Sequence, residues 1–308
     1  MLIESEFDIQ FHLPQPIAMV AMLHVHPSIE PQLVTEDLIR VEHIGPSDGG
    51  DGVRELPVLE YLDCFGNRCT RFLAPAGAIR LAGRHILNAS ETRDPQGYGL
   101  SQTPVEQLPS ETLQFLLASR YCQVDQFGAI AQDLFGHMGT GWALAAAIRD
   151  WVHAKVTFNY GAARPTKTAA DVFSERIGVC RDFQHLAITL TRAMNIPARY
   201  VTGQLGDIRA PYSSPGDFSA WYQIWLDGRW WDMDARHNEP RLGRVLMAVG
   251  RDAADVAITT SFGRADLKHF YVESNEIDSE GRKVPLPPKL PATTEPVLSS
   301  QTTFPASR

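Results

Sequence analysis

The chain has 308 residues, of which 44% are hydrophobic and 21% charged, an ordinary composition for a globular protein that buries a sizeable core in one or two domains. The formal net charge of -8 at pH 7 and the absence of any basic run exclude nucleic acid and anionic membranes as expected partners. Acidic residues stand near the start, where a signal peptide would be basic and then apolar, and no apolar stretch is long enough to span a membrane. Together with the small number of cysteines, four, these features predict a cytoplasmic protein.

The first part of the chain, residues 1–105, is predicted to be a β-rich domain. Strand-like runs span 7–11, 17–25, 38–44 and 56–62, with a loop at 45–52 and a hairpin turn at 63–70. Metal ligands are conceivable here, namely Cys64 and Cys69 around that turn and His24, His26 and His43 on the strands. Nothing in the spacing brings them together, so we expect strand-end thiols, solvated histidines and no metal.

A second domain is predicted at 106–275, after a polar linker bearing proline and glycine at 88–109. Helical patterns span 110–117, with Ser110 as the N-cap, and 140–156. Thr168 and Asp171 have the spacing of a capping box, and Cys122 is expected to be a buried thiol. Residues 276–308 are polar and rich in proline, which predicts a disordered tail.

Cys180 lies where a loop is predicted to become a long amphipathic helix. Apolar residues follow it at helical spacing and the helix is expected to end near Asn195, before the sequence Ile196-Pro197. A thiol in the first helical turn faces unpaired backbone N–H groups and the positive end of the helix dipole, which should lower its pKa. Cys180 is therefore the candidate nucleophile, and a small buried hydrophobic residue is the alternative interpretation.

A strand at 198–204, a polar loop at 206–216 and then a β-hairpin are predicted to follow this helix. The hairpin joins strands 218–226 and 229–234 through the turn Asp227-Gly228. In that register Trp221 faces Asp234, and Ser219 lies diagonally from Asp234 on the same face of the sheet.

These motifs, in this order, resemble the transglutaminase-like superfamily in its bacterial cysteine protease branch, over residues 151–263. The resemblance implies an α+β fold, with a transglutaminase-like, papain-like cysteine proteinase core behind the N-terminal β-rich domain. It also implies a cysteine nucleophile at a helix start, a base histidine directly before Ala-Trp, and an aspartate that orients the base. Cys180 and Asp234 match two of these positions, but the histidine position holds Ser219.

This serine removes the expected base, because a hydroxyl does not take a proton from a thiol near neutral pH. His237 is the nearest candidate to replace it, and an ordinary loop histidine is the alternative interpretation. Strict alternation along the strand would turn His237 to the other face, unless a bulge or the strand end intervenes. His185, five residues after Cys180, should lie on a polar face of the helix and be solvated.

The resemblance implies acyl transfer on an amide. Cys180 would attack the carbonyl, backbone N–H groups at the helix start would hold the oxyanion, and water or an amine would resolve the thioester. We expect hydrolysis of a peptide or protein substrate without a metal or cofactor. The alternative is a pseudoenzyme that keeps the cleft and the thiol and acts as a binding module.

Overall fold

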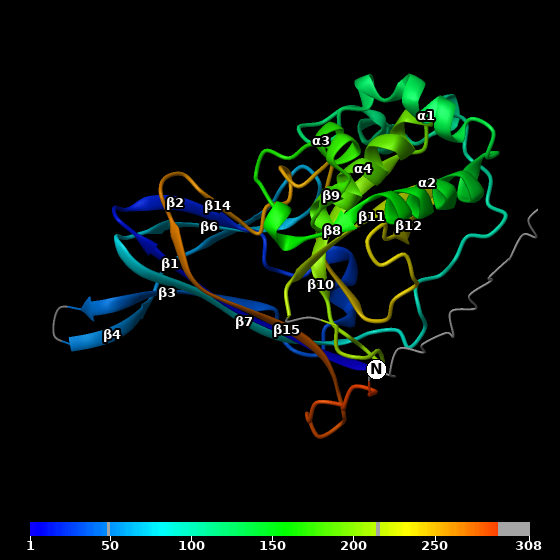
Figure 1. Ribbon diagram of the computed structural model, residues 1–308. Coiled ribbons are helices and arrows are strands. Elements are labelled where there is room, and N and C mark those ends of the chain that lie inside the picture. Colours follow the sequence, from blue (N-terminus) through cyan, green and yellow to red (C-terminus); the bar gives the residue numbers. More distant parts are fainter. Residues whose placement is uncertain (48–49, 214–215, 289–308) are drawn as a thin grey trace, which may run out of the picture.

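The computed structural model describes residues 1–47, 50–213 and 216–288. The molecule has two parts that lie side by side: a β-rich part and a part in which helices cover a four-stranded sheet (Figure 1). This arrangement confirms the predicted α+β fold. The last 20 residues of the predicted tail, 289–308, lie outside the described residues.

Two antiparallel sheets make up the β-rich part, and side chains that alternate along the strands form the core between them. In β1, for example, Phe7, Ile9 and Phe11 are buried while the residues between them are more exposed. The first sheet has the order β15-β1-β7-β3-β4 and the second β14-β2-β6-β5. The strands are β1 (Leu2–Leu13), β2 (Ile17–Ala21), β3 (Leu38–Ser47), β4 (Gly50–Glu55), β5 (Leu59–Leu62), β6 (Arg68–Ala74), β7 (Gly77–Asn88), β14 (Thr259–Ser261) and β15 (Asp266–Ile277).

Two predictions for this part are wrong. The predicted loop at 45–52 is largely a hairpin, because β3 and β4 pair from Glu42 to Glu55. His24 is buried rather than solvated: its Nδ1 lies 3.1 Å from a carboxylate oxygen of Asp37, and its Nε2 lies 3.1 Å from the hydroxyl of Thr70. Burying an imidazole requires such partners, which no strand pattern reveals.

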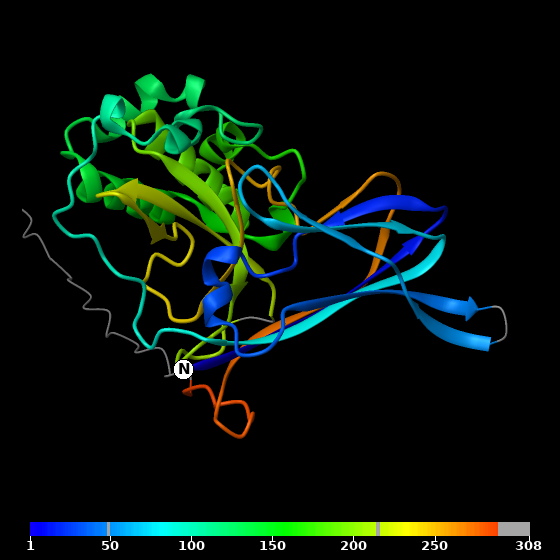
Figure 2. The same cartoon turned by 180° about the vertical axis from the view of Figure 1, so that it is seen from behind.

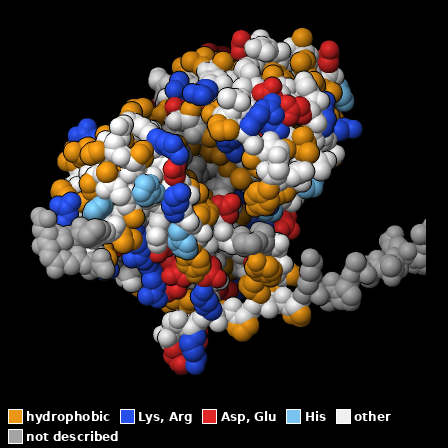
Figure 3. Space-filling view, turned by 60° about the vertical axis from the view of Figure 1, so that its left-hand side comes forward, with side chains coloured by type: hydrophobic (Ala, Val, Ile, Leu, Met, Phe, Trp, Pro, Cys, Tyr) orange, Lys and Arg blue, Asp and Glu red, His pale blue; other side chains and the backbone are white. Residues whose placement is uncertain are grey.

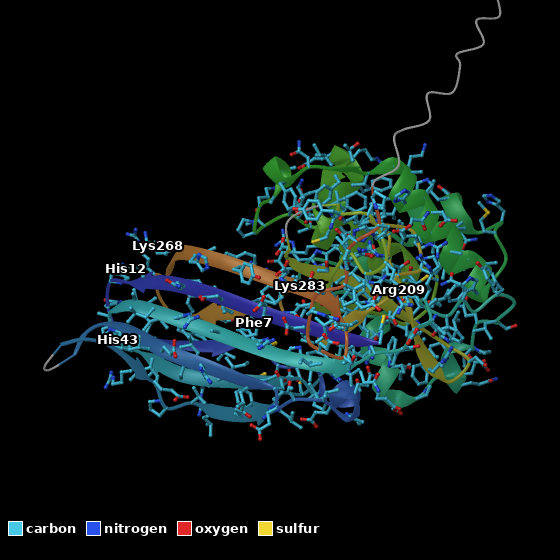
Figure 4. The ribbon with its side chains drawn as sticks, turned by 90° about the horizontal axis from the view of Figure 1, so that it is seen from below. Phe7, His12, His43, Arg209, Lys268 and Lys283 are labelled. Carbon is cyan, nitrogen blue, oxygen red and sulfur yellow. The ribbon has the colours of Figure 1, made fainter. Side chains whose placement is uncertain are left out.

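The β-rich part is built from both ends of the chain. Strands β14 and β15 lie in the segment that the sequence predicts as the second domain, yet they pair with β2 and β1. The register of the longer pair runs from Leu2 opposite Ile277 to His12 opposite Asp266. Seen from behind and from below, β15 follows β1 along the sheet (Figure 2, Figure 4). Because of this return, residues near the C-terminus reach the second part of the molecule.

Helix α4 (Cys180–Ala193) lies at the centre of the second part, against strands β10 and β11 on one side and helices α1, α2 and α3 on the other. The sheet has the order β12-β11-β10-β13. The other elements are α1 (Gly128–Phe135), α2 (Gly141–Lys155), α3 (Ala169–Glu175), β8 (Thr157–Phe158), β9 (Ile177–Gly178), β10 (Ala198–Leu205), β11 (Phe218–Leu226), β12 (Arg229–Met233) and β13 (Arg244–Gly250), with 3-10 turns η1 (Pro27–Gln32), η2 (Val105–Gln107), η3 (Ser110–Leu116), η4 (Val124–Gln126) and η5 (Tyr160–Ala162).

The helix predictions for this part mostly hold. The helix expected at 140–156, the capping box of Thr168 and Asp171, and the buried thiol of Cys122 are confirmed. The segment at Ser110 differs, since it is a 3-10 turn whose N-cap is Pro109. No helix in the described ranges combines the length and the hydropathy needed to cross a bilayer.

His185 is buried, so the prediction that it is solvated is wrong. Helix α4 is covered on all sides, and the backbone N–H of Ala253 donates to Nε2 of His185 at 3.1 Å. The ring also stacks on Tyr121, with centroids 4.9 Å apart. Burial lowers the pKa of His185 well below its usual value, which keeps the ring neutral and able to accept that hydrogen bond.

Candidate active site

Cys180 is the first residue of α4, and the backbone before it is shaped to start a helix. Val179 is the N-cap in an extended conformation, and the carboxylate of Asp182 accepts a hydrogen bond from the Val179 N–H at 3.0 Å. Gly178 allows this closure, because a Cβ there would lie 2.6 Å from the Asp182 Cβ. The Cys180 thiol is thus held at a fixed point, half-buried.

The helix start does not by itself activate this thiol. Burial raises the pKa of Cys180, while the charge of Arg236 and the backbone amides of Arg181 and Ala220 act in the opposite direction. The net shift is upward, so the prediction that the helix dipole lowers the pKa is wrong: desolvation of the sulfur outweighs it. A neighbouring group must therefore take the proton if a thiolate is to form near neutral pH.

Asp234 follows directly after β12 and is only 4% exposed. One carboxylate oxygen accepts from the backbone N–H groups of Arg236 at 2.9 Å and His237 at 3.1 Å, and the other lies 3.0 Å from Nδ1 of His237. Although burial opposes ionisation, the hydrogen bond from His237 and the charge of Arg244 hold the pKa of Asp234 well below its usual range. Asp234 is therefore an anion that orients the His237 ring.

The ring of His237 reaches Asp234 because the strand has already ended. β12 stops at Met233, and the N–H of Asn238 donates to the Asp234 carbonyl at 3.0 Å, which closes a turn. Strict alternation, which would direct His237 to the other face, does not apply inside that turn. A carboxylate only accepts, so Nδ1 carries a proton and Nε2 of the neutral ring is free to act as a base.

Gln184 joins α4 to this acid. It lies one helical turn after Cys180 and is fully buried. Its amide nitrogen donates to the Ala220 carbonyl and to Asp234, and its amide oxygen accepts from the Ala235 N–H, each at 3.1 Å. The nucleophile helix, β11 and the turn with His237 are therefore fixed to one another by a single side chain.

Cys180, Ser219 and His237 line one pocket of about 130 Å³. Its walls come from the loop between β10 and β11, from the turn after β12 and, across the boundary between the two parts, from residues 273–275 of β15. The surface is hollowed between the β-rich and the helical part (Figure 3). Ser219 is half-buried opposite Gly203, and its hydroxyl has no hydrogen-bond partner among the described residues.

The sequence analysis assigned no role in the site to Gln184, Arg236 or Arg244. Only Gln184 leaves a signal, because its spacing of four from Cys180 places both on one helix face. The buried Arg244 contacts Asp94 at 2.8 Å and Asp234 at 3.5 Å, a long-range pairing that no local pattern indicates. Across the described ranges, no three His, Cys, Asp or Glu side chains converge in a way that could hold a metal ion.

Replacing Gln184 by methionine is expected to lower kcat roughly 100-fold with little change in KM, because the turn that carries His237 would shift relative to α4. The free energy of unfolding should fall by about 3 kcal/mol, since buried partners in Ala220, Asp234 and Ala235 lose their hydrogen bonds. Steady-state kinetics with a cleavable peptide and urea denaturation measure the two effects.

Gln204→Met is the matched control for this variant. Gln204 is 1% exposed and neither atom of its amide has a partner among the described residues, so its replacement should leave kcat unchanged and not reduce stability. A Gln184→Met enzyme with normal kcat but reduced stability would show that the residue has a structural role only.

The chain that carries this site is similar to a known family and to two other proteins. Residues 129–235 match the model of the transglutaminase-like superfamily (Transglut_core). A crystal structure titled a "Putative Cysteine Protease" from Cytophaga hutchinsonii is 27% identical, with 93% of each chain covered and a TM-score of 0.74. "Uncharacterized protein ML0607" of Mycobacterium leprae (strain TN) is 28% identical over 223 residues, which are 67% of this chain and 78% of that protein.

Proposed function

We propose that this chain, whose residues 129–235 match the model of the transglutaminase-like superfamily, transfers acyl groups from amides, with Cys180 as the nucleophile and His237 as its base. The observation that carries this proposal is the hydrogen bond between Asp234 and His237, in a pocket that Cys180 also lines. The bonded pair supplies the base that Ser219 cannot provide.

In the proposed reaction, Nε2 of His237 takes the thiol proton of Cys180 and Asp234 stabilises the imidazolium that forms. The thiolate attacks the amide carbonyl. The backbone amides of Arg181 and Ala220, which favour negative charge at this sulfur, would stabilise the oxyanion. The C–N bond then breaks, and the imidazolium gives its proton to the leaving amine. A thioester on Cys180 remains.

Water, deprotonated by His237, would attack this thioester and release the acid and the free thiol. We favour hydrolysis over transfer to an amine because the similar protein from Cytophaga hutchinsonii is described as a "Putative Cysteine Protease". A peptide or protein is then the proposed substrate, and no step calls for a metal or cofactor. An inactive binding module is the alternative outcome of the test below.

The rate of Cys180 alkylation by iodoacetamide against pH tests this proposal. A thiol activated by His237 should react rapidly at pH values below about 8.5, the usual pKa of a free cysteine. Without that base, burial would delay the reaction to still higher pH, because it raises the pKa of Cys180. Slow labelling at neutral pH would contradict the enzyme proposal and support the binding module.

A further inference from the structure

Arg236 places a positive charge at the edge of the active-site pocket. Arg236 lines the pocket with Cys180 and also an adjoining hollow, and His237 lines both. The guanidinium carbon lies 4.0 Å from the centre of the Phe158 ring. Stacking on a ring covers one face of a guanidinium and leaves the N–H groups along its edge available.

Two other arginines around these hollows, Arg241 and Arg209, are neutralised by carboxylates. Arg241 pairs with Asp207 at 3.4 Å, Arg209 pairs with Glu276 at 2.6 Å, and both partners are close enough to satisfy the charge. Arg93, in the adjoining hollow, has no ion pair among the described residues, but it donates a hydrogen bond to the Pro240 carbonyl at 2.8 Å. The guanidinium of Arg236, in contrast, forms neither an ion pair nor a hydrogen bond with any described residue. Its charge does act on the carboxyl of Asp217, which lines the same pocket, but the two groups are not in direct contact.

An arginine with free N–H donors next to a nucleophile can bind a carboxylate of the substrate. Its donors form a rigid fork that matches the two oxygens of a carboxylate, and such charge-assisted pairs are stronger than neutral hydrogen bonds. The charge of Arg236 already acts on Cys180, so a bound carboxylate would lie within reach of the scissile amide.

We infer that Arg236 binds a carboxylate of the substrate next to the amide that Cys180 attacks, so that the preferred substrates are acidic peptides. This inference rests on the proposed function and adds the substrate class. The carboxylate can be an Asp or Glu side chain or the C-terminal carboxylate of a short peptide, because both present the same pair of oxygens.

Two alkylating reagents that differ only in charge test the inference without any known substrate. Iodoacetate carries a carboxylate and iodoacetamide carries none, so the ratio of their rates at Cys180 reports recruitment of the anion. In Arg236→Gln this ratio should fall roughly tenfold. Arg236→Lys keeps the charge but loses the fork, and its ratio should lie between the two.

Arg209→Gln is the matched control, because it removes the same charge from the adjoining hollow at an exposed, paired arginine (Figure 4). Its ratio should equal that of the unchanged protein. An Arg236→Gln ratio that also stays unchanged would overturn the inference. Slow labelling by both reagents would instead contradict the proposed function, and the ratio still reports on Arg236 in that case.

Peptide cleavage separates the two sources of the carboxylate. Paired peptides carrying Glu or Gln beside the scissile bond test the side chain, and paired peptides with a free or an amidated C-terminus test the terminal group. The unchanged protein should cleave one acidic member at least tenfold better than its neutral partner, and Arg236→Gln should abolish that preference. Equal cleavage within both pairs would overturn the inference.

Discussion

Replacement of Cys180 by alanine is expected to abolish acyl transfer completely. The thiol forms the only covalent bond to the acyl group in the proposed reaction, and loss of a nucleophile costs catalysis on the order of a million-fold in comparable enzymes. p-Nitrophenyl acetate, which needs no specific recognition, is a suitable probe. The unchanged protein should release a burst of one p-nitrophenolate per active site and carry a hydroxylamine-sensitive acetyl group on Cys180.

Cys64→Ala is the control for this experiment. Cys64 is an exposed thiol in the β5–β6 turn, so it can be acetylated without any activation. Its replacement should leave the burst intact, whereas Cys180→Ala should remove it. A burst that survives in Cys180→Ala and is lost in Cys64→Ala would show that the reaction is adventitious and would contradict Cys180 as the nucleophile.

The β11–β12 hairpin could be predicted because its turn chemistry is local. Asp227 and Gly228 both adopt positive φ, 50° and 76°, as the two-residue turn that fits a twisted hairpin requires. The register that follows pairs Tyr222 with Met233, as predicted, although β12 ends at Met233, one residue before the predicted strand end at Asp234. The helix that starts at Cys180 is equally local, because the apolar spacing and the following proline define it.

The pairing of β15 with β1 could not be predicted, because its partners are more than 250 residues apart and a strand pattern does not identify its neighbour. This pairing also matters for the site. It brings residues 273–275 to the pocket wall, where Gly206 and Gly216 pack so closely on β15 that a Cβ at either would lie within 2 Å of a carbonyl oxygen. Strand β15 therefore completes the pocket, although local sequence patterns do not show that it lies there.

The candidate site could be predicted only in part. Cys180 follows from its place at a predicted helix start, and Asp234 follows from the family resemblance. The orientation of His237, however, depends on where β12 ends, and a shift of one residue reverses the face. The burial of His185 could not be predicted either, because it depends on residues distant in the sequence. Its polar helix neighbours predicted solvent, but Tyr121 and the segment around Ala253 cover that face.

The position of the imidazole explains how the site can work with Ser219. The family pattern places a base on β11, which faces Asp234 across the hairpin, but here the same carboxylate is bonded to an imidazole three residues after it. In the proposed reaction only the element that carries the base changes, while Cys180 and Asp234 lie on α4 and after β12. Gln184 supports this because it fixes Asp234 to α4 independently of position 219.

His237→Ala is therefore expected to reduce kcat/KM roughly 1,000-fold, within the range that general bases contribute. The iodoacetamide reaction of Cys180 should move to higher pH in this variant, since burial then acts on the thiol without a proton acceptor. Asp234→Asn should have an effect of similar direction, because an amide cannot hold Nδ1 of His237 as a carboxylate does. Peptide cleavage and pH-dependent alkylation measure both variants.

Two further variants make this prediction decisive. His137→Ala removes an exposed imidazole outside the pocket and should change neither rate nor pH dependence. Ser219→Ala should lower kcat/KM by less than about tenfold, because a hydroxyl is not the base. If His237→Ala kept full activity while Ser219→Ala lost it, the base would not be His237, and the bond between Asp234 and His237 would be structural only. Recovery of His237→Ala by added imidazole would identify the missing group as the proton acceptor itself, since a variant with a displaced backbone cannot be restored by a small molecule.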